Sequence, residues 1–187
     1  MTRRAILLKA LASMPSDVER MQKGADAAGK DLARVLQHLL EGETVYRAQF
    51  QAVVHAERPV LSALEPGLTD DGDVAFEELV GRFQAARQET LEFLEHLSVG
   101  DWQRKAVHES MGETSLRFLV QLLVDSDTHH LSQLSAARHG LPLAEGFSPV
   151  SPWDPARPGG LNPTFDSEVK NERKRTRKWP RKRTRRD

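Results

Sequence analysis

Apolar residues recur every three to four positions through most of residues 1–139, and this period restricts the possible folds more than any other feature. It predicts helices over residues 4–27, 31–57, 74–97 and 114–139. The apolar stripe of the second segment consists of Leu32, Val35, Leu36, Leu39, Val45, Tyr46, Phe50 and Val53. No alternating run of useful length, the pattern of a half-buried strand, is present. We therefore predict an all-α domain, a four-helix bundle with long connections between some of its helices.

Proline and glycine residues indicate where these helices end. Pro15 lies within the first segment, so we expect a break there, with a new helix capped by Ser16 or Asp17. Pro59 is expected to stop the second helix, and a linker rich in Pro, Gly and Asp follows at 65–73. Gly140 suits a left-handed cap at the end of the fourth helix.

The chain is electrically neutral overall, with 27 Lys and Arg against 27 Asp and Glu, but its charges are segregated. Residues 166–187 hold eleven basic and four acidic side chains, a net charge of +7, which leaves 16 basic and 23 acidic groups, or −7, in residues 1–165. Six prolines fall within 141–165. We therefore predict a bundle over 1–140, a Pro/Gly-rich linker over 141–165 and a disordered basic tail over 166–187.

Cysteine is absent, so a metal would have to be held by His, Asp, Glu, hydroxyl or carbonyl groups. Arg3 and Arg4 precede a short apolar run, but Lys9 interrupts it, which favours an amphipathic helix over a signal peptide. No segment reaches the roughly 18 apolar residues that a membrane span requires. We therefore expect a cytoplasmic protein with no membrane span.

Two histidines on different predicted helices are the first candidates for a functional site. His38 lies on the second helix and His130 on the fourth. Positions three and four apart share a helix face, so His130 shares its face with Ser126 and Asp127, whereas His129 lies about 100° away. A pocket between the two helices would bring together His38, His130 and either Ser126 or Asp127. By spacing alone, such histidines are more often hydrogen-bonded structural groups than ligands.

Several short motifs, in order and at suitable distances over roughly residues 5–139, resemble the DinB/YfiT-like family. Those resembling its second helix are His38-Leu39, Glu43, Tyr46 to Phe50 and Glu57-Arg58-Pro59. Those resembling the lead into its last helix are Asp101-Trp102, His108, Gly112 and Ser115-Leu116. Asp127, His130 and Gln133-Leu134 resemble the metal motif of that helix.

The resemblance implies a four-helix bundle, often a homodimer, that binds a divalent metal such as Zn²⁺ or Ni²⁺ through three histidines. Carried over, the first ligand is His38 and the last is His130. The middle ligand falls at position 126, where this chain has Ser126, and a neutral hydroxyl is a poor substitute for imidazole. Asp127 could supply a carboxylate instead and complete a His₂Asp site.

Some members of this family look like metal-dependent transferases that activate a small thiol, and others like hydrolases acting on a small molecule. Several are linked to stress or DNA damage. A metal with an open position lowers the pKa of a bound water or thiol and creates a nucleophile at neutral pH. The resemblance thus implies a metal-dependent enzyme, with a substrate that the sequence does not identify.

The basic tail suggests an alternative, a non-catalytic scaffold that binds nucleic acid without sequence preference. The candidate contacts are Lys170, Arg173, Lys174, Arg175, Arg177, Lys178, Arg181, Lys182, Arg183, Arg185 and Arg186, with Trp179 able to stack on an unpaired base. The same composition is compatible with a solubilising extension, with an anionic membrane surface or acidic protein as partner, and with folding back onto the acidic bundle.

Overall fold

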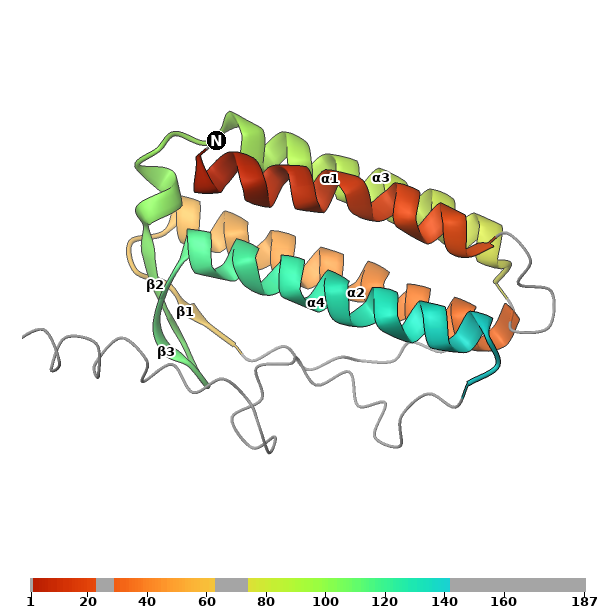
Figure 1. The fold of residues 1–187 in the computed structure, drawn as a ribbon. Coiled ribbons are helices and arrows are strands. Elements are labelled where there is room, and N and C mark those ends of the chain that lie inside the picture. The colour runs from red at the N-terminus through yellow and green to blue at the C-terminus, as the bar shows by residue number, and fades with distance from the viewer. Residues whose placement is uncertain (1, 23–28, 63–73, 142–187) are drawn as a thin grey trace, which may run out of the picture.

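Four long helices dominate the computed structural model, which describes residues 2–22, 29–62 and 74–141. They are α1 (Arg3–Gln22), α2 (Gly29–His55), α3 (Phe76–His96) and α4 (Leu116–Arg138). Helices α1 and α2 each pack against α3 and α4, so the four form a square bundle (Figure 1). The predicted four-helix bundle is confirmed. Gly140 has a φ of +63°, the left-handed conformation expected after the last helix.

Helix α1 runs through Pro15 without interruption, so the expected break at this residue is wrong. Proline lacks an N–H and leaves the carbonyl four residues earlier, here that of Leu11, without its helical donor. Arg87 of α3 replaces that donor, with its Nη1 3.4 Å from the Leu11 carbonyl oxygen. The missing hydrogen bond is thus supplied from another helix, which the local sequence of α1 does not reveal.

A small sheet, not foreseen from the sequence, closes one end of the bundle (Figure 1). Strand β1 (Val60–Leu61) pairs in parallel with β2 (Lys105–His108), which pairs antiparallel with β3 (Gly112–Ser115). A 3₁₀ turn, η1 (Asp101–Gln103), precedes β2. Arg104 joins this end to α2, donating from Nε to the Val53 carbonyl at 2.8 Å and from Nη2 to the Ala56 carbonyl at 2.9 Å.

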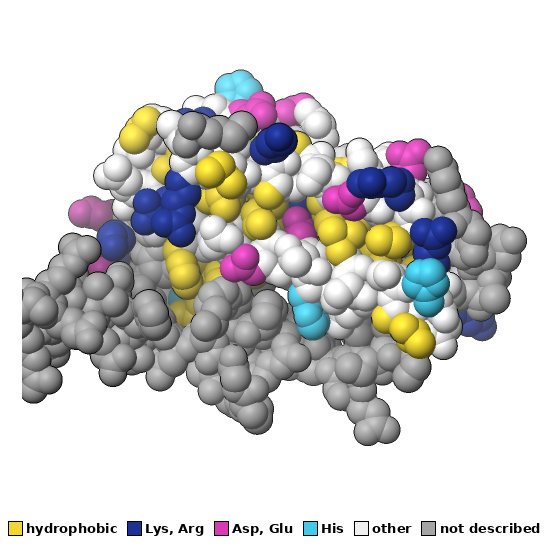
Figure 2. Space-filling view, viewed as in Figure 1, with side chains coloured by type: hydrophobic (Ala, Val, Ile, Leu, Met, Phe, Trp, Pro, Cys, Tyr) yellow, Lys and Arg dark blue, Asp and Glu magenta, His cyan; other side chains and the backbone are white. Residues whose placement is uncertain are grey.

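The outer faces of the helices carry charged side chains of both signs. Figure 2 shows Lys and Arg interspersed with Asp and Glu on one face. Ion pairs at the surface include Arg82–Glu78 within α3 and Arg47–Glu89 between α2 and α3. In the ranges that the structure describes, no helix is both long and apolar enough to cross a membrane.

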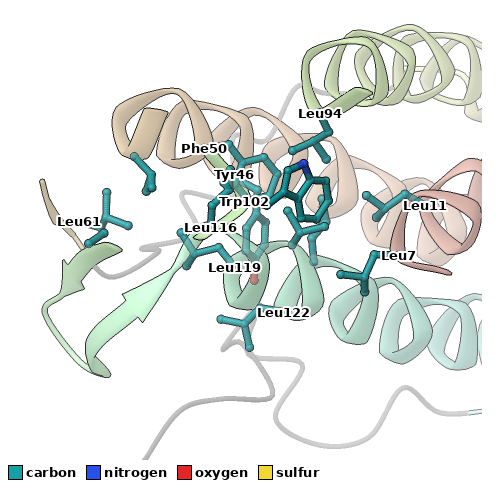
Figure 3. Close-up of a cluster of buried hydrophobic side chains, with 14 of the residues drawn as sticks. Leu7, Leu11, Tyr46, Phe50, Leu61, Leu94, Trp102, Leu116, Leu119 and Leu122 are labelled. Carbon is teal, nitrogen blue, oxygen red and sulfur yellow. The ribbon is translucent and has the colours of Figure 1, made fainter. Parts of the chain in front are cut away.

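The interior consists of two apolar clusters, one toward each end of the bundle. The cluster at the sheet end includes Leu7, Leu11, Tyr46, Phe50, Trp102 and Leu116, all labelled in Figure 3, together with Leu91 and Leu123. The cluster at the other end includes Met14, Val18, Leu36, Leu39, Phe83 and Leu134. On α3, Arg87 falls between Phe83 of one cluster and Leu91 of the other. The boundary between the clusters is therefore polar.

The predicted linker at 141–165, apart from Leu141, and the predicted basic tail lie outside the described residues, as does the whole Pro/Gly/Asp-rich linker predicted at 65–73.

Candidate functional site

The structure brings His38 of α2 and His130 of α4 into contact. Their ring centroids are 4.8 Å apart and the ring planes are tilted by 49°. Both residues are nearly buried, with exposed fractions of 7% and 6%. Each histidine belongs to the buried stripe of its helix. The packing of α2 against α4 therefore holds the two rings together.

A backbone hydrogen bond fixes the orientation of His130. Its Nδ1 lies 2.7 Å from the carbonyl oxygen of Ser126, one turn earlier on α4. A carbonyl only accepts, so Nδ1 carries the proton and donates, and Nε2 keeps the lone pair that could bind a ligand. The hydroxyl of Ser126 is 3.3 Å from the same Nδ1. Ser126 thus lies beside His130, as the helical spacing predicted.

Both imidazoles are neutral near pH 7. Burial, reinforced by the neighbouring His38, lowers the pKa of His130 to about 3, and the hydrogen bond to Ser126 opposes this only in part. Burial also lowers the pKa of His38, with Glu41 opposing and His129 adding to the shift. A neutral imidazole is the form that binds metals, so the pair is in the state that a ligand role requires.

Asp127 does not face the two histidines. Its carboxylate is held by Arg87 of α3, with Nη1–Oδ2 and Nη2–Oδ1 distances of 2.6 and 2.9 Å. In the described ranges, no three His, Asp or Glu side chains are grouped so that they could hold a metal. The structure therefore brings together two members of the expected His₂Asp set and gives the third another partner.

Arg87 and Glu43 complete a buried charged network that the sequence analysis missed. Glu43 of α2 accepts from Arg87 through one oxygen, Oε2, at 2.9 Å from Nε and 2.7 Å from Nη2. The exposed fractions are 1% for Arg87, 0% for Glu43 and 5% for Asp127. Burial raises the pKa of each carboxyl, and the Arg87 guanidinium opposes this. The sequence does contain an indication of this network. Arg87 is four residues from both Phe83 and Leu91, so a cation occupies a core position of α3.

His129 is partly buried and has a separate partner. Its Nε2 lies 3.1 Å from the amide nitrogen of Gln133, which donates to it. Its ring meets that of His130 edge-on, with centroids 5.6 Å apart. This supports the prediction that His130, rather than His129, faces α2.

His108, another residue of the motifs above, is buried in β2. Its Nδ1 accepts from the backbone N–H of Ser110 at 3.3 Å and lies 3.1 Å from the Ser110 hydroxyl. Through these contacts, the His108 side chain holds the turn between β2 and β3. The predicted nucleic-acid-binding residues, from Lys170 to Arg186, lie outside the described residues.

Comparisons with known proteins agree with this architecture. The family model described as the DinB superfamily matches residues 2–134. Among solved structures, the chain is similar to YfiT from Bacillus subtilis, described as a probable metal-dependent hydrolase with an unusual four-helix bundle topology. The alignment has a TM-score of 0.62 and 14% identity, and it covers 74% of this chain and 89% of that one. At this identity the likeness shows the fold alone. No curated protein sequence matches the chain.

Proposed function

Because the chain belongs to the DinB superfamily, we propose that His38 and His130 bind a divalent metal ion used in hydrolysis or group transfer on a small molecule. The observation that carries this proposal is the contact between the two rings across α2 and α4, at 4.8 Å between centroids. The description of YfiT as a probable metal-dependent hydrolase supports the reaction class. Zn²⁺ and Ni²⁺ are among the metals that imidazole ligands suit.

The donor set fits a metal through two imidazoles. The Ser126 carbonyl holds the Nδ1 proton of His130 and thereby presents Nε2 as the ligand atom, the usual arrangement around metal-binding histidines. Ser126 adds a hydroxyl on the same turn. When bound, a divalent metal with open positions would lower the pKa of a water or a thiol and so supply a nucleophile. The nearly buried histidine pair would limit access of bulk water to that nucleophile.

Replacing either histidine is expected to abolish metal binding. His38→Ala and His130→Ala should each weaken the affinity for Zn²⁺ or Ni²⁺ by more than the roughly 10- to 100-fold that loss of an outer partner costs, because each removes a direct ligand. Calorimetric titration of untagged protein measures this. His129→Ala is the matched control, since that ring lies next to His130 but bonds to Gln133. An equal loss of affinity in His129→Ala would mean that the ligand role proposed for His130 has been given to the wrong histidine. Ser126→His should raise the affinity, and no gain would mean that position 126 does not face the metal.

The segregated charge supports a second candidate, non-specific nucleic-acid binding through residues 166–187. Eleven Lys and Arg lie in these 22 residues, whereas residues 1–165 carry −7. On the face shown in Figure 2, basic side chains of the described residues are interspersed with acidic ones. We therefore assign the affinity for phosphates to the basic tail. The two proposals are compatible, because the tail could localise an enzyme.

Binding of the full-length chain to a random oligonucleotide is expected to fall by orders of magnitude between about 50 and 200 mM salt, if six or more phosphate contacts form. Fluorescence anisotropy across a salt series measures this, with a chain ending at Pro149 as the control. Trp179→Ala should weaken binding to single strands more than to duplex, because stacking needs an exposed base. If the shortened chain binds equally well, or if neither chain binds at low salt, the tail is not a nucleic-acid element.

A further inference from the structure

We propose that Glu43, Arg87 and Asp127 form a charged layer whose role is to position His38 against His130. Arg87 is the centre of this layer and contacts every other helix of the bundle. From α3 it donates to the Leu11 carbonyl of α1, to Glu43 of α2 and to both carboxylate oxygens of Asp127 of α4. One side chain thus joins all four helices at a single level.

The charged layer lies at the boundary between the two apolar clusters on every helix. On α2, Leu39 and Tyr46 of different clusters flank Glu43, and on α4, Leu123 and Leu134 flank Asp127. On α1 the boundary falls between Leu11, whose carbonyl Arg87 contacts, and Met14. At the level of the charged layer, the buried contacts among the helices are therefore polar and directional.

The histidines lie just beyond this layer on the same side of it. His38 precedes Glu43 by five residues and His130 follows Asp127 by three, and α2 and α4 run in opposite directions (Figure 1). At 1.5 Å per residue, these offsets are about 7.5 and 4.5 Å toward the end of the bundle away from the sheet. A shift of one helix along the other would change the distance between the rings directly.

Apolar contacts alone specify the register of helices weakly, because hydrophobic burial has no direction. A guanidinium that binds a carboxylate through two parallel hydrogen bonds has a fixed geometry. Buried polar groups of this kind can specify the register of helices at some cost in stability. Arg87 forms such a bidentate ion pair with Asp127 and a second ion pair with Glu43. We infer that the layer sets the position of α4 relative to α2 and thus the spacing of the histidine pair.

Cross-linking can test this inference without any metal. The natural chain has no cysteine, so His38→Cys/His130→Cys introduces the only two thiols, and the rate of bridging by a short bis-reactive thiol reagent reports their proximity. In this background, Glu43→Leu/Arg87→Met/Asp127→Leu replaces the layer by apolar groups, a change that often leaves stability unaltered or raises it. The bridging rate should fall about tenfold, which corresponds to about 1.4 kcal/mol of lost register preference.

The matched control removes another ion pair between helices. Arg47→Met/Glu89→Leu also removes an ion pair between α2 and α3, but one whose Glu89 side chain is 64% exposed, and it should leave the bridging rate unchanged. If the triple variant does not fold, Arg87→Lys serves instead, because lysine keeps the charge and loses the two-pronged geometry. Slower bridging in the folded variant supports the proposal, and bridging at the parent rate overturns it. The functional meaning of the layer rests on the proposed metal site, but failure of metal binding would leave this result standing.

Discussion

Arg87→Met is expected to lower the free energy of unfolding by about 3 to 5 kcal/mol, the cost of breaking a buried ion pair by removing one partner. The variant would leave Glu43 and Asp127 buried without their cation, at exposed fractions of 0% and 5%. It would also remove the donor that replaces the missing Pro15 N–H at the Leu11 carbonyl. Urea unfolding of parent and variant at pH 7 measures the difference.

A surface ion pair provides the control for this loss. Arg82 and Glu78 are joined at 2.6 Å within α3, but their side chains are 47% and 57% exposed. Arg82→Met should therefore change the free energy of unfolding by about 1 kcal/mol at most. If Arg87→Met lowered the free energy of unfolding no more than Arg82→Met does, Glu43 and Asp127 would have to find water or other donors in the folded state. The charged layer would then not be important for the stability of the bundle.

The bundle was predictable because its main signal is local. The stripe of α2, from Leu32 to Val53, can be recognised from spacing within one helix. Pro15 led to a wrong prediction because the compensating donor lies on α3, far away in the chain. Strands of two and four residues were missed because they are too short to show an alternating pattern. Local patterns thus identified the helices but not the contacts that modify them.

The candidate site shows the same limit of local reasoning. The period of α4 correctly placed Ser126 beside His130, and His129 has a separate partner in Gln133. Periodicity does not predict which side chains of the neighbouring helices each residue contacts. Asp127 meets Arg87, a residue that could be recognised in the sequence only as a cation within an apolar stripe. The carboxylate that completed the expected ligand set is thereby assigned to the charged layer.

Metal-free protein is expected to lose about 2 kcal/mol of stability between pH 7 and pH 5 through His130 alone. Its pKa is about 3 in the folded chain, against an ordinary value of 6.5. The unfolded chain therefore binds a proton in this range that the folded chain does not. The stabilisation is present above pH 6.5 and is lost as the pH falls, with a slope that approaches about 1.36 kcal/mol per pH unit well below pH 6.5. Burial also lowers the pKa of His38 and His108, so both add to the loss.

Urea unfolding with a chelator present, at pH values from 7 to 5, measures this loss, and His130→Gln should flatten the curve because glutamine does not titrate. His96→Gln is the matched control. His96 also bonds through Nδ1 to the carbonyl one turn earlier, at 2.6 Å from Glu92, but its ring is exposed to water in the folded chain. Its replacement controls for the loss of an imidazole outside the bundle interior. Equal losses in parent and His130→Gln would show that the His130 ring is protonated within the folded bundle, and the pair would then be a poor metal ligand at mildly acidic pH.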